Sequence, residues 1–457
     1  MINLPEAYII QMKRLLGEAG FFAYEKALSE PVTRALRVNL LLREDGTLPC
    51  EIEGVAGPVP WAKGCYFVKG DARPGLSPLH EGGLFYLQEP SALSAVSVLN
   101  PQPGERVLDL CAAPGGKSTQ IAGLMQGKGL LVCNEPVPSR AQILSRNIER
   151  MGVRNAVVTS AMPVQLAPHF EAFFDRILVD APCSGEGMFR RQPEARDEWS
   201  ENSPRGCADR AMEILHEAAK MLAPGGVMVY STCTFNDTEN EGVLARFTKE
   251  HTEFTLEAFD LPGLPSGGRG WAHLYPHEIC GEGHFVSLLR KSPAAPGAPE
   301  RIEEKPQRAQ KNLRGKENAK KKPAPAMAVP DVLAEGVALG RLHMAGESLW
   351  ALPDGLDDIS RLNGLRVLRT GLLLAHMEGK RAEPDHALAM ALRPEEAART
   401  AELTHEQAML YQAGEALDLG ELPPGYTLLT LHGISLGFGK QAGGVMKNHY
   451  PKGLRRR

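Results

Sequence analysis

The chain has 457 residues, a formal net charge of −4 and eight cysteines. No apolar run approaches the roughly 20 residues of a membrane span, and Pro5, Glu6 and further charges stand where a signal peptide needs an apolar core. We therefore expect a cytoplasmic protein of roughly two to four domains that does not bind membranes. Because the cysteines are sparse and the expected location is the cytoplasm, we expect no paired disulfides. Because the cysteines include no C-x2-C pair, we also expect no metal site.

In chain order, residues 1–87 predict a mixed cap, with helices near residues 5–28 and a strand at 36–42. Helices and strands then alternate from residue 88 to residue 290. The predicted helices cover 90–99, about 117 onward, 139–152 and 208–226, and the predicted strands cover 106–110, 130–135, 156–160, 176–180 and 226–232. Strands separated by helices predict an α/β fold with a doubly wound parallel sheet.

The stretch 291–325 has ten Lys/Arg, six Pro and only two bulky apolar residues, so it cannot bury a core and is predicted to be a basic linker. Charge also changes here. Residues 1–290 hold 27 Lys/Arg against 35 Asp/Glu, a net charge of −8, whereas residues 291–457 hold 24 against 20, a net charge of +4.

The last 22 residues, 436–457, carry six basic residues and no acidic one. This composition favours contact with nucleic acid, with the cations on phosphates and Tyr450 as a stacking surface, although a solvated basic tail would have the same composition. The candidate phosphate contacts are Lys440, Lys447, Lys452, Arg455, Arg456 and Arg457.

In a doubly wound sheet the ligand binds beyond the carboxyl ends of the strands, where the strand order reverses. Three predicted strands end on candidate residues. The first runs into a turn with Ala112, Ala113, Gly115 and Gly116, the second ends at Glu135, and the third ends at Asp180. The turn has neither dinucleotide nor phosphate-loop spacing. Glu135 could accept the hydroxyls of a ribose, or it could cap the following helix.

Two predicted strands also lead into a cysteine. Cys183 follows Pro182 just after Asp180, and Cys233 follows Thr232. A buried and inert thiol is the ordinary interpretation of one such cysteine. Why two strands of one sheet should each lead into a thiol is a question that this interpretation leaves open.

The motifs "LDLCAAPGGKS" (108–118), "DAPCSGEGMFRR" (180–191) and "YSTCT" (230–234) resemble those of the Nol/Nop/Sun (Fmu) family of RNA cytosine-5 methyltransferases. The stretch "GFGKQAGGVMKNHYPKGLR" (437–455) resembles the C-terminal signature of the RsmF-type subgroup, which modifies small-subunit ribosomal RNA. The resemblance implies a Rossmann-like class I methyltransferase domain at 88–290 that uses S-adenosyl-L-methionine. It also implies an N-terminal RNA-binding α+β cap at 1–87. At the C-terminus it implies the subgroup's first C-terminal module at 326–395 and a PUA-like RNA-binding module at 396–457.

In that family a thiolate adds to carbon 6 of cytosine so that carbon 5 can attack the methyl group. The resemblance makes Cys233 the nucleophile, Cys183 the thiol that assists product release, and Asp180 the partner of the base edge. Arg190 and Arg191 would meet neighbouring phosphates, or form a solvated basic turn.

The resemblance also implies a set of cofactor contacts. Glu135 would hold the ribose, Arg140 would lie nearby, and Asp180 would border the cofactor as well as the base. The methionine part would rest on the turn formed by Cys111, Ala112, Ala113, Pro114, Gly115, Gly116 and Lys117. One departure concerns adenine. Where the family has an acid or amide, this chain has Ser160, Ala161 and Met162, which leaves backbone groups, the Ser160 hydroxyl or apolar packing to hold adenine.

The expected function is methylation of carbon 5 of cytosine in 16S ribosomal RNA, by a monomer acting on ribosomal RNA or the small ribosomal subunit. Two alternatives remain. The same chemistry could act on transfer RNA, or the chain could be a non-catalytic assembly factor that binds RNA. The assembly factor is the weaker alternative because both cysteines are present.

Overall fold

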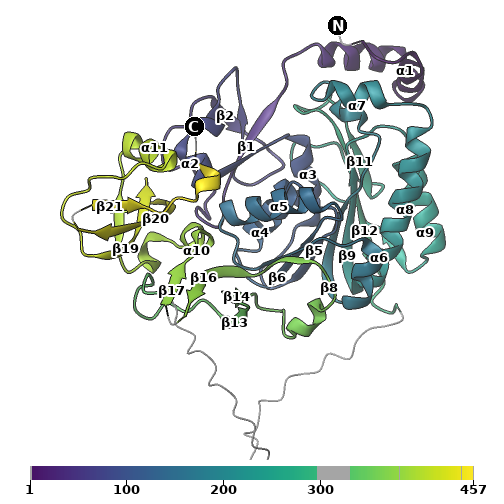
Figure 1. The fold of residues 1–457 in the computed structure, drawn as a ribbon. Helices are drawn as coiled ribbons and strands as arrows, with labels where there is room; N and C mark the ends of the chain where they lie inside the picture. The colour runs from purple at the N-terminus through teal and green to yellow at the C-terminus, as the bar shows by residue number, and fades with distance from the viewer. Residues whose placement is uncertain (1–2, 296–329, 380, 444, 456–457) are drawn as a thin grey trace, which may run out of the picture.

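The computed structural model describes residues 3–295, 330–379, 381–443 and 445–455. Its central sheet has the strand order β10-β12-β9-β8-β5-β6-β7-β15, with β11 paired to β12 (Figure 1). The parallel part consists of β5 (Arg106–Asp109), β6 (Leu130–Asn134), β7 (Ala156–Thr159), β8 (Phe174–Asp180) and β9 (Leu222–Thr232). The order reverses between β5 and β8. The predicted α/β fold with a doubly wound sheet is thus confirmed.

Helices cover both faces of this sheet. One face packs against α3 (Ser94–Leu99), α4 (Gly116–Leu124) and α5 (Pro138–Arg150). The other packs against α6 (Pro163–Leu166), α8 (Ser203–Met221) and α9 (Glu241–Glu250), while α7 (Pro193–Glu198) precedes α8. The strands between these layers are apolar and almost fully buried, as Val132 and Leu178 are. Burial on both faces explains why the sequence shows continuous apolar runs here.

Beyond β9, the central sheet continues with antiparallel strands. β12 (His284–Lys291) pairs with β9, and β10 (Phe254–Leu256) and β11 (Trp271–Leu274) pair with β12. Lys291, predicted as the first linker residue, instead ends β12, where it is buried and donates to the carbonyls of Ala219 and Leu222. Residues 296–325 of the predicted linker lie outside the described residues.

The N-terminal part has one long helix and a small sheet. The helix α1 (Glu6–Leu28) precedes the sheet β2-β3-β1-β4, formed by β2 (Val55–Pro58), β3 (Cys65–Val68), β1 (Arg34–Val38) and β4 (Phe85–Gln88), and α2 (Pro78–Glu81) lies between β3 and β4. β1 is shorter than the predicted strand at 36–42 because the chain turns at Asn39. The Asn39 amide donates to the carbonyls of Gly83 and Met151, which holds that turn in place.

The chain beyond residue 330 forms two sheets. The first joins β13 (Arg341–Ala345), β14 (Ser348–Leu352), β16 (Leu372–Glu378) and β17 (Arg381–Pro384), followed by α10 (His386–Ala391). The second joins β18 (Thr400–Glu402), β19 (Gly425–Leu431), β20 (Ile434–Ala442) and β21 (Val445–Asn448), with α11 (His405–Ala413). Figure 1 shows these sheets beside the N-terminal part of the chain.

These C-terminal elements are joined to the rest of the molecule. β15 (Val367–Thr370) lies within the predicted module 326–395, but it pairs antiparallel with β7 and forms an edge of the central sheet. Residues of the last sheet share a core with the N-terminal part, where Leu429 and Tyr411 pack in one cluster with Leu36 and Phe85. The sequence pattern contains no signal for either contact. No helix in the described ranges is long and apolar enough to cross a membrane.

Candidate active site

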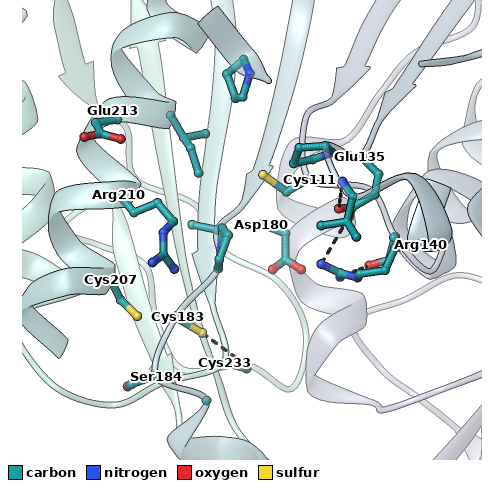
Figure 2. A pocket seen from close by; sticks show the side chains of 18 of the residues that line it. Cys111, Glu135, Arg140, Asp180, Cys183, Ser184, Cys207, Arg210, Glu213 and Cys233 are labelled. Carbon is teal, nitrogen blue, oxygen red and sulfur yellow. Dashed lines mark hydrogen bonds and ion pairs between the residues drawn. The ribbon is translucent and has the colours of Figure 1, made fainter. Parts of the chain in front are cut away.

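A cavity of about 1000 Å³ opens at the reversal of strand order, beyond the carboxyl ends of β6, β8 and β9. It brings together most of the residues expected from the sequence. Figure 2 shows Glu135 and Arg140 on one side of Asp180, with Cys207, Arg210 and Glu213 of α8 on the other. The expected site residues that line the cavity are Cys111, Ala113, Glu135, Arg140, Asp180, Cys183 and Cys233. In the described chain, no cluster of three His, Cys, Asp or Glu side chains could hold a metal ion.

The two cysteines of interest meet at the floor of this cavity. The sulfur atoms of Cys183 and Cys233 are 3.3 Å apart, although the residues are fifty positions apart in sequence. The hydrogen bond to Cys233 raises the pKa of Cys183 well above its usual value, and burial raises it further. Cys183 therefore stays a thiol at neutral pH and can share its proton with the Cys233 sulfur.

Asp180, at the end of β8, is ionised and held on two sides. Lys117 Nζ lies 2.8 Å from one carboxylate oxygen, and the Ser231 hydroxyl donates to the other at 2.8 Å. Burial alone would raise the pKa of Asp180, but Lys117 and the nearby His284 outweigh burial and hold this pKa well below its usual range. Asp180 is thus a fixed negative charge beside the thiols.

Lys117 is oriented toward these groups. Burial alone would lower its pKa, but Asp180 and then Cys233 outweigh burial and keep the pKa of Lys117 above its usual value. The ammonium therefore remains charged within the site that contains Asp180 and Cys233. The sequence had placed Lys117 among the contacts of the methionine part, and the structure couples it to Asp180 and Cys233.

The two cysteine turns are tied together by carboxylates that the sequence interpretation had passed over. Glu239 is buried and accepts from the Ser184 backbone N–H at 2.8 Å, from the Ser184 hydroxyl and from the Asn236 amide. Glu186 is also buried and accepts from the backbone N–H groups of Phe235 and Asn236. Glu186 lies inside the quoted motif 180–191, and Glu239 lies five residues past the motif 230–234, so an acid shortly after each cysteine was the available signal. His284, from β12, has no such signal.

Glu186 also connects these turns to α1. Its carboxylate accepts from the Gln11 amide at 2.8 Å and from the Trp199 indole at 3.3 Å. Around this contact, Tyr8 and Tyr24 of α1 pack edge to face against Phe189 and Phe235, each a few residues past a cysteine turn. The first helix of the chain therefore forms the wall behind the catalytic loops.

The turn at 111–117 joins β5 to α4. Only Cys111 and Ala113 of this turn line the cavity. A Cβ atom on Gly115 would meet Leu144 and Asn147 of α5, at 3.2 and 3.3 Å, and one on Gly116 would meet Gln88 and Tyr86. These glycines therefore allow close packing of the turn on α5 and β4, whereas the sequence had assigned them to close approach of a ligand.

Glu135, at the end of β6, is only 2% exposed. One carboxylate oxygen accepts from the Val137 backbone N–H at 3.0 Å, and the other lies 3.4 Å from an Arg140 nitrogen. The first contact supports the start of α5, as the structural alternative predicted. The carboxylate also lines the cavity, so it remains available to a ligand there.

The segment after β7 has little polar capacity left for adenine. The backbone N–H groups of Ser160, Ala161 and Met162 donate to Arg366, Asn134 and Gln165, and the Ser160 hydroxyl faces the Pro136 carbonyl at 3.5 Å. In contrast, the apolar side chains of Met162 and Val164 line the cavity opposite Val137. Of the three possibilities left by the sequence, apolar packing is the one that this geometry favours.

Comparison with known proteins agrees with this site. A model of the 16S rRNA methyltransferase RsmB/F family matches residues 96–290. Models of the N-terminal domain of RsmF, its first C-terminal domain and its PUA domain match residues 4–90, 331–392 and 398–456. The ribosomal RNA small subunit methyltransferase F of Serratia proteamaculans is 34% identical over 99% of this chain and 97% of its own length. The chain belongs to the ribosomal RNA small subunit methyltransferase F family.

Other relatives agree with that assignment. The family member from Escherichia coli is 31% identical over 99% of this chain and 97% of its own length. A methyltransferase homologue from Pyrococcus horikoshii, of known structure, is 28% identical with a TM-score of 0.53, and the match covers 64% of this chain and 96% of that one. NSun6 from the same organism, solved with SFG, is 23% identical with a TM-score of 0.53 over 63% and 98% of the two chains, and it shows the same fold.

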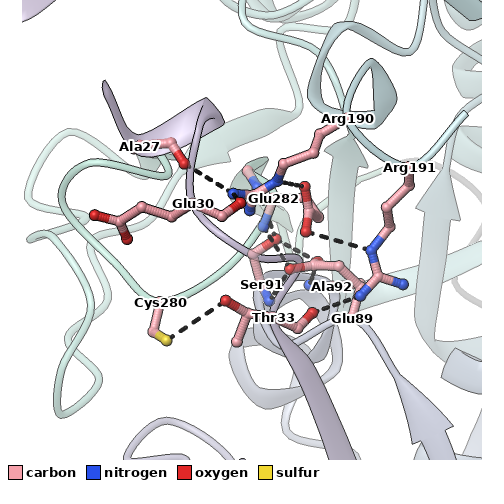
Figure 3. Close-up of polar contacts among 11 residues, drawn as sticks. Ala27, Glu30, Thr33, Glu89, Ser91, Ala92, Arg190, Arg191, Cys280 and Glu282 are labelled. Carbon is pink, nitrogen blue, oxygen red and sulfur yellow. Dashed lines mark hydrogen bonds and ion pairs between the residues drawn. The ribbon is translucent and has the colours of Figure 1, made fainter. Parts of the chain in front are cut away.

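Arg190 and Arg191 do not have the position that contact with RNA phosphates requires. Their side chains are 6% and 24% exposed, and both pair with the buried carboxylate of Glu282 (Figure 3). They also donate to carbonyls in the last turn of α1 and just after it. Arg190 donates to Ala27 and Glu30, and Arg191 donates to Thr33. The expected phosphate contact is wrong, because these cations fasten the N-terminal segment to the methyltransferase domain.

The prediction that Tyr450 offers a stacking surface for a base is also wrong. Tyr450 is 3% exposed and packs against His386 and Tyr411, so it cannot stack on a base. Lys447 and Lys452 are exposed, as a phosphate contact requires, while Lys440 lies over the Tyr426 ring and Arg455 is half-buried. Arg456 and Arg457 lie outside the described residues.

Proposed function

We propose that this chain methylates carbon 5 of cytosine in small-subunit ribosomal RNA, with S-adenosyl-L-methionine as the methyl donor. The observation that carries the proposal is the pair of cysteine sulfurs 3.3 Å apart beside an ionised Asp180, in a cavity that also contains Glu135. We further propose that a monomer acts in the cytoplasm, on naked ribosomal RNA or on the small subunit. Its family membership favours this substrate over transfer RNA.

The residues of the cavity fit S-adenosyl-L-methionine, which supplies an electrophilic methyl group when bound. Glu135 offers a buried carboxylate to ribose hydroxyls, and Arg140 keeps that carboxylate oriented. Val137, Met162 and Val164 offer an apolar wall for adenine. The turn at 111–117 borders the methionine part through Cys111 and Ala113. With this apolar wall, adenine can be bound without an acidic residue after β7.

The protein groups then carry out the steps on cytosine. The Cys233 thiolate forms a bond to carbon 6, and the electron pair of the 5,6 double bond moves to carbon 5, which becomes the nucleophile. Lys117 holds the Asp180 carboxylate in place, and Asp180 accepts a hydrogen bond from the base edge. After methylation, carbon 5 passes its proton to water, the electron pair of that C–H bond re-forms the 5,6 double bond, and the bond from carbon 6 to sulfur breaks with its electron pair on the Cys233 sulfur. Cys183, at 3.3 Å, can return a proton to the departing sulfur.

The test is methylation of purified RNA. The protein is incubated with S-adenosyl-L-methionine and either small-subunit ribosomal RNA or transfer RNA, and 5-methylcytosine is mapped in both. We expect modified cytosine in the ribosomal RNA alone. Modification confined to transfer RNA would support the alternative substrate, and cofactor binding without methylation of either RNA, or of the small subunit, would support the assembly factor.

A further inference from the structure

The side of the cavity away from Glu135 contains a cation with no partner. Arg210, on α8, lines the cavity and is exposed, and it makes no hydrogen bond or ion pair with any residue in the described ranges. The other basic residues of the cavity wall are paired. Arg140 pairs with Glu135, and His216 contacts Glu250 and His251. Among the described residues that line the cavity, Arg210 is therefore the one arginine that is free to bind a ligand.

Arg210 lies close to the reacting groups. Its charge acts on the Cys207 thiol, and that thiol interacts in turn with Cys233. Figure 2 shows the Arg210 guanidinium directed toward the side of the cavity with Cys207 and Cys183, whereas the carboxylate of Glu213, one turn along α8, lies farther from these cysteines. An anionic group brought into this half of the cavity would reach Arg210 before it reached any other unpaired cation.

The proposed function requires such a group. A cytosine that enters the cavity brings its own sugar and phosphate, and Glu135 with the apolar wall leaves the α8 side for that nucleotide. The ionised Asp180 and the nearby Glu213 would repel a phosphate. Residues 1–290, which include this site, also have a net charge of −8. A guanidinium can bind a phosphate with two parallel hydrogen bonds, which compensates for this repulsion.

We propose that Arg210 binds the phosphate of the target nucleotide and thereby seats the cytosine over Cys233. This inference rests on the proposed function and adds to it a residue that selects for a nucleotide in a strand over a free base. Arg210 takes the role that the sequence had given to Arg190 and Arg191. It is a binding residue for RNA and takes no part in holding the cofactor.

The test compares Arg210→Gln with Arg205→Gln. Arg205 lies on the same helix, is also exposed and unpaired within the described chain, and does not line the cavity. With small-subunit ribosomal RNA as the probe, we expect Arg210→Gln to raise Kd and KM about tenfold or more. The slope of log affinity against log salt should also fall by roughly 0.7 to 0.9, the value for one phosphate contact. Arg210→Lys should keep the slope and recover part of the affinity.

Melting temperature and cofactor affinity serve as folding controls and should match the wild type. Equal RNA affinity and salt slope in Arg210→Gln and the wild type would overturn the assignment, and so would an equal loss in Arg205→Gln. A fall in kcat with unchanged RNA affinity would also overturn it, because Arg210 would then act through the thiols. A wild-type protein that methylates no RNA would instead refute the proposed function, so the two failures are distinguishable.

Discussion

Replacing Glu135 tests the cofactor half of the site. Its carboxylate contacts the Val137 N–H at 3.0 Å and Arg140 at 3.4 Å. Glu135→Ala would therefore remove both of these contacts as well as the hydrogen bonds to the ribose. Glu135→Gln keeps an oxygen for Val137, removes the charge and replaces the other oxygen by an NH2 group. A charge-assisted hydrogen bond contributes about 1.5 to 3 kcal/mol and a neutral one about 0.5 to 1.5. Two ribose bonds, each weakened by about 1 kcal/mol, amount to about 2 kcal/mol, or roughly thirtyfold in Kd.

The assay is calorimetric titration with S-adenosyl-L-methionine. Glu135→Gln should bind about thirtyfold more weakly, and Glu135→Ala about a hundredfold or more. Glu213→Gln is the matched control, because Glu213 lines the opposite side of the cavity and should leave cofactor affinity unchanged. Binding of Glu135→Gln within twofold of the wild type would refute the ribose contact. An equal loss in Glu213→Gln would mean that the effect is the overall charge of the cavity.

Four further outcomes are expected. On a denaturing gel with RNA and cofactor, Cys183→Ala should accumulate a covalent RNA adduct and Cys233→Ala should form none; a band in the Cys233 variant would mean that the roles are reversed. Arg190→Met leaves the buried Glu282 with one cation fewer, so it should cost about 3 kcal/mol of stability and lower the melting temperature, with no change in the salt slope of RNA binding. The pKa of Asp180 is lowered in the folded protein, so its ion pair with Lys117 stabilises the fold above the pKa of an unfolded carboxyl, near 4. This stabilisation is lost as the pH falls through the pKa that Asp180 has in the folded protein. In thermal melts, Lys117→Met should move this loss of stability to higher pH. Lys447→Gln and Lys452→Gln should each reduce the salt slope of RNA binding by roughly 0.7, and an unchanged slope would mean that this end of the chain is merely solvated.

The strand pattern and the motif positions were sufficient to predict the parallel sheet and the residues at its carboxyl edge. Asp180, Cys183 and Cys233 could be grouped because the ends of parallel strands meet at one edge of a sheet. Partners that come from distant segments could not be predicted. A buried His284 has the same letter in the sequence as an exposed one, and nothing local indicates that it faces the site.

The same limit explains the wrong predictions. Arg190 and Arg191 were interpreted by charge alone, and their partner, the buried Glu282, lies about ninety residues further along the chain. Tyr450 has basic neighbours in sequence, but its ring is covered by residues of α10 and α11. Composition indicates what a segment can bind only when its side chains are exposed, and exposure is a property of the folded chain.

The pairing of β15 with β7 has a consequence for the order in which the protein folds. The two strands are separated by roughly 200 residues, so at ~5 to 20 residues per second the ribosome needs ~10 to 40 s to produce the second after the first. During that interval the edge of β7 has no partner from its own chain, and an open strand edge is a template for wrong pairing. Completion of the sheet must wait for a segment synthesised long after the catalytic residues. The nascent chain therefore passes through a period in which its methyltransferase core is formed but still prone to aggregate.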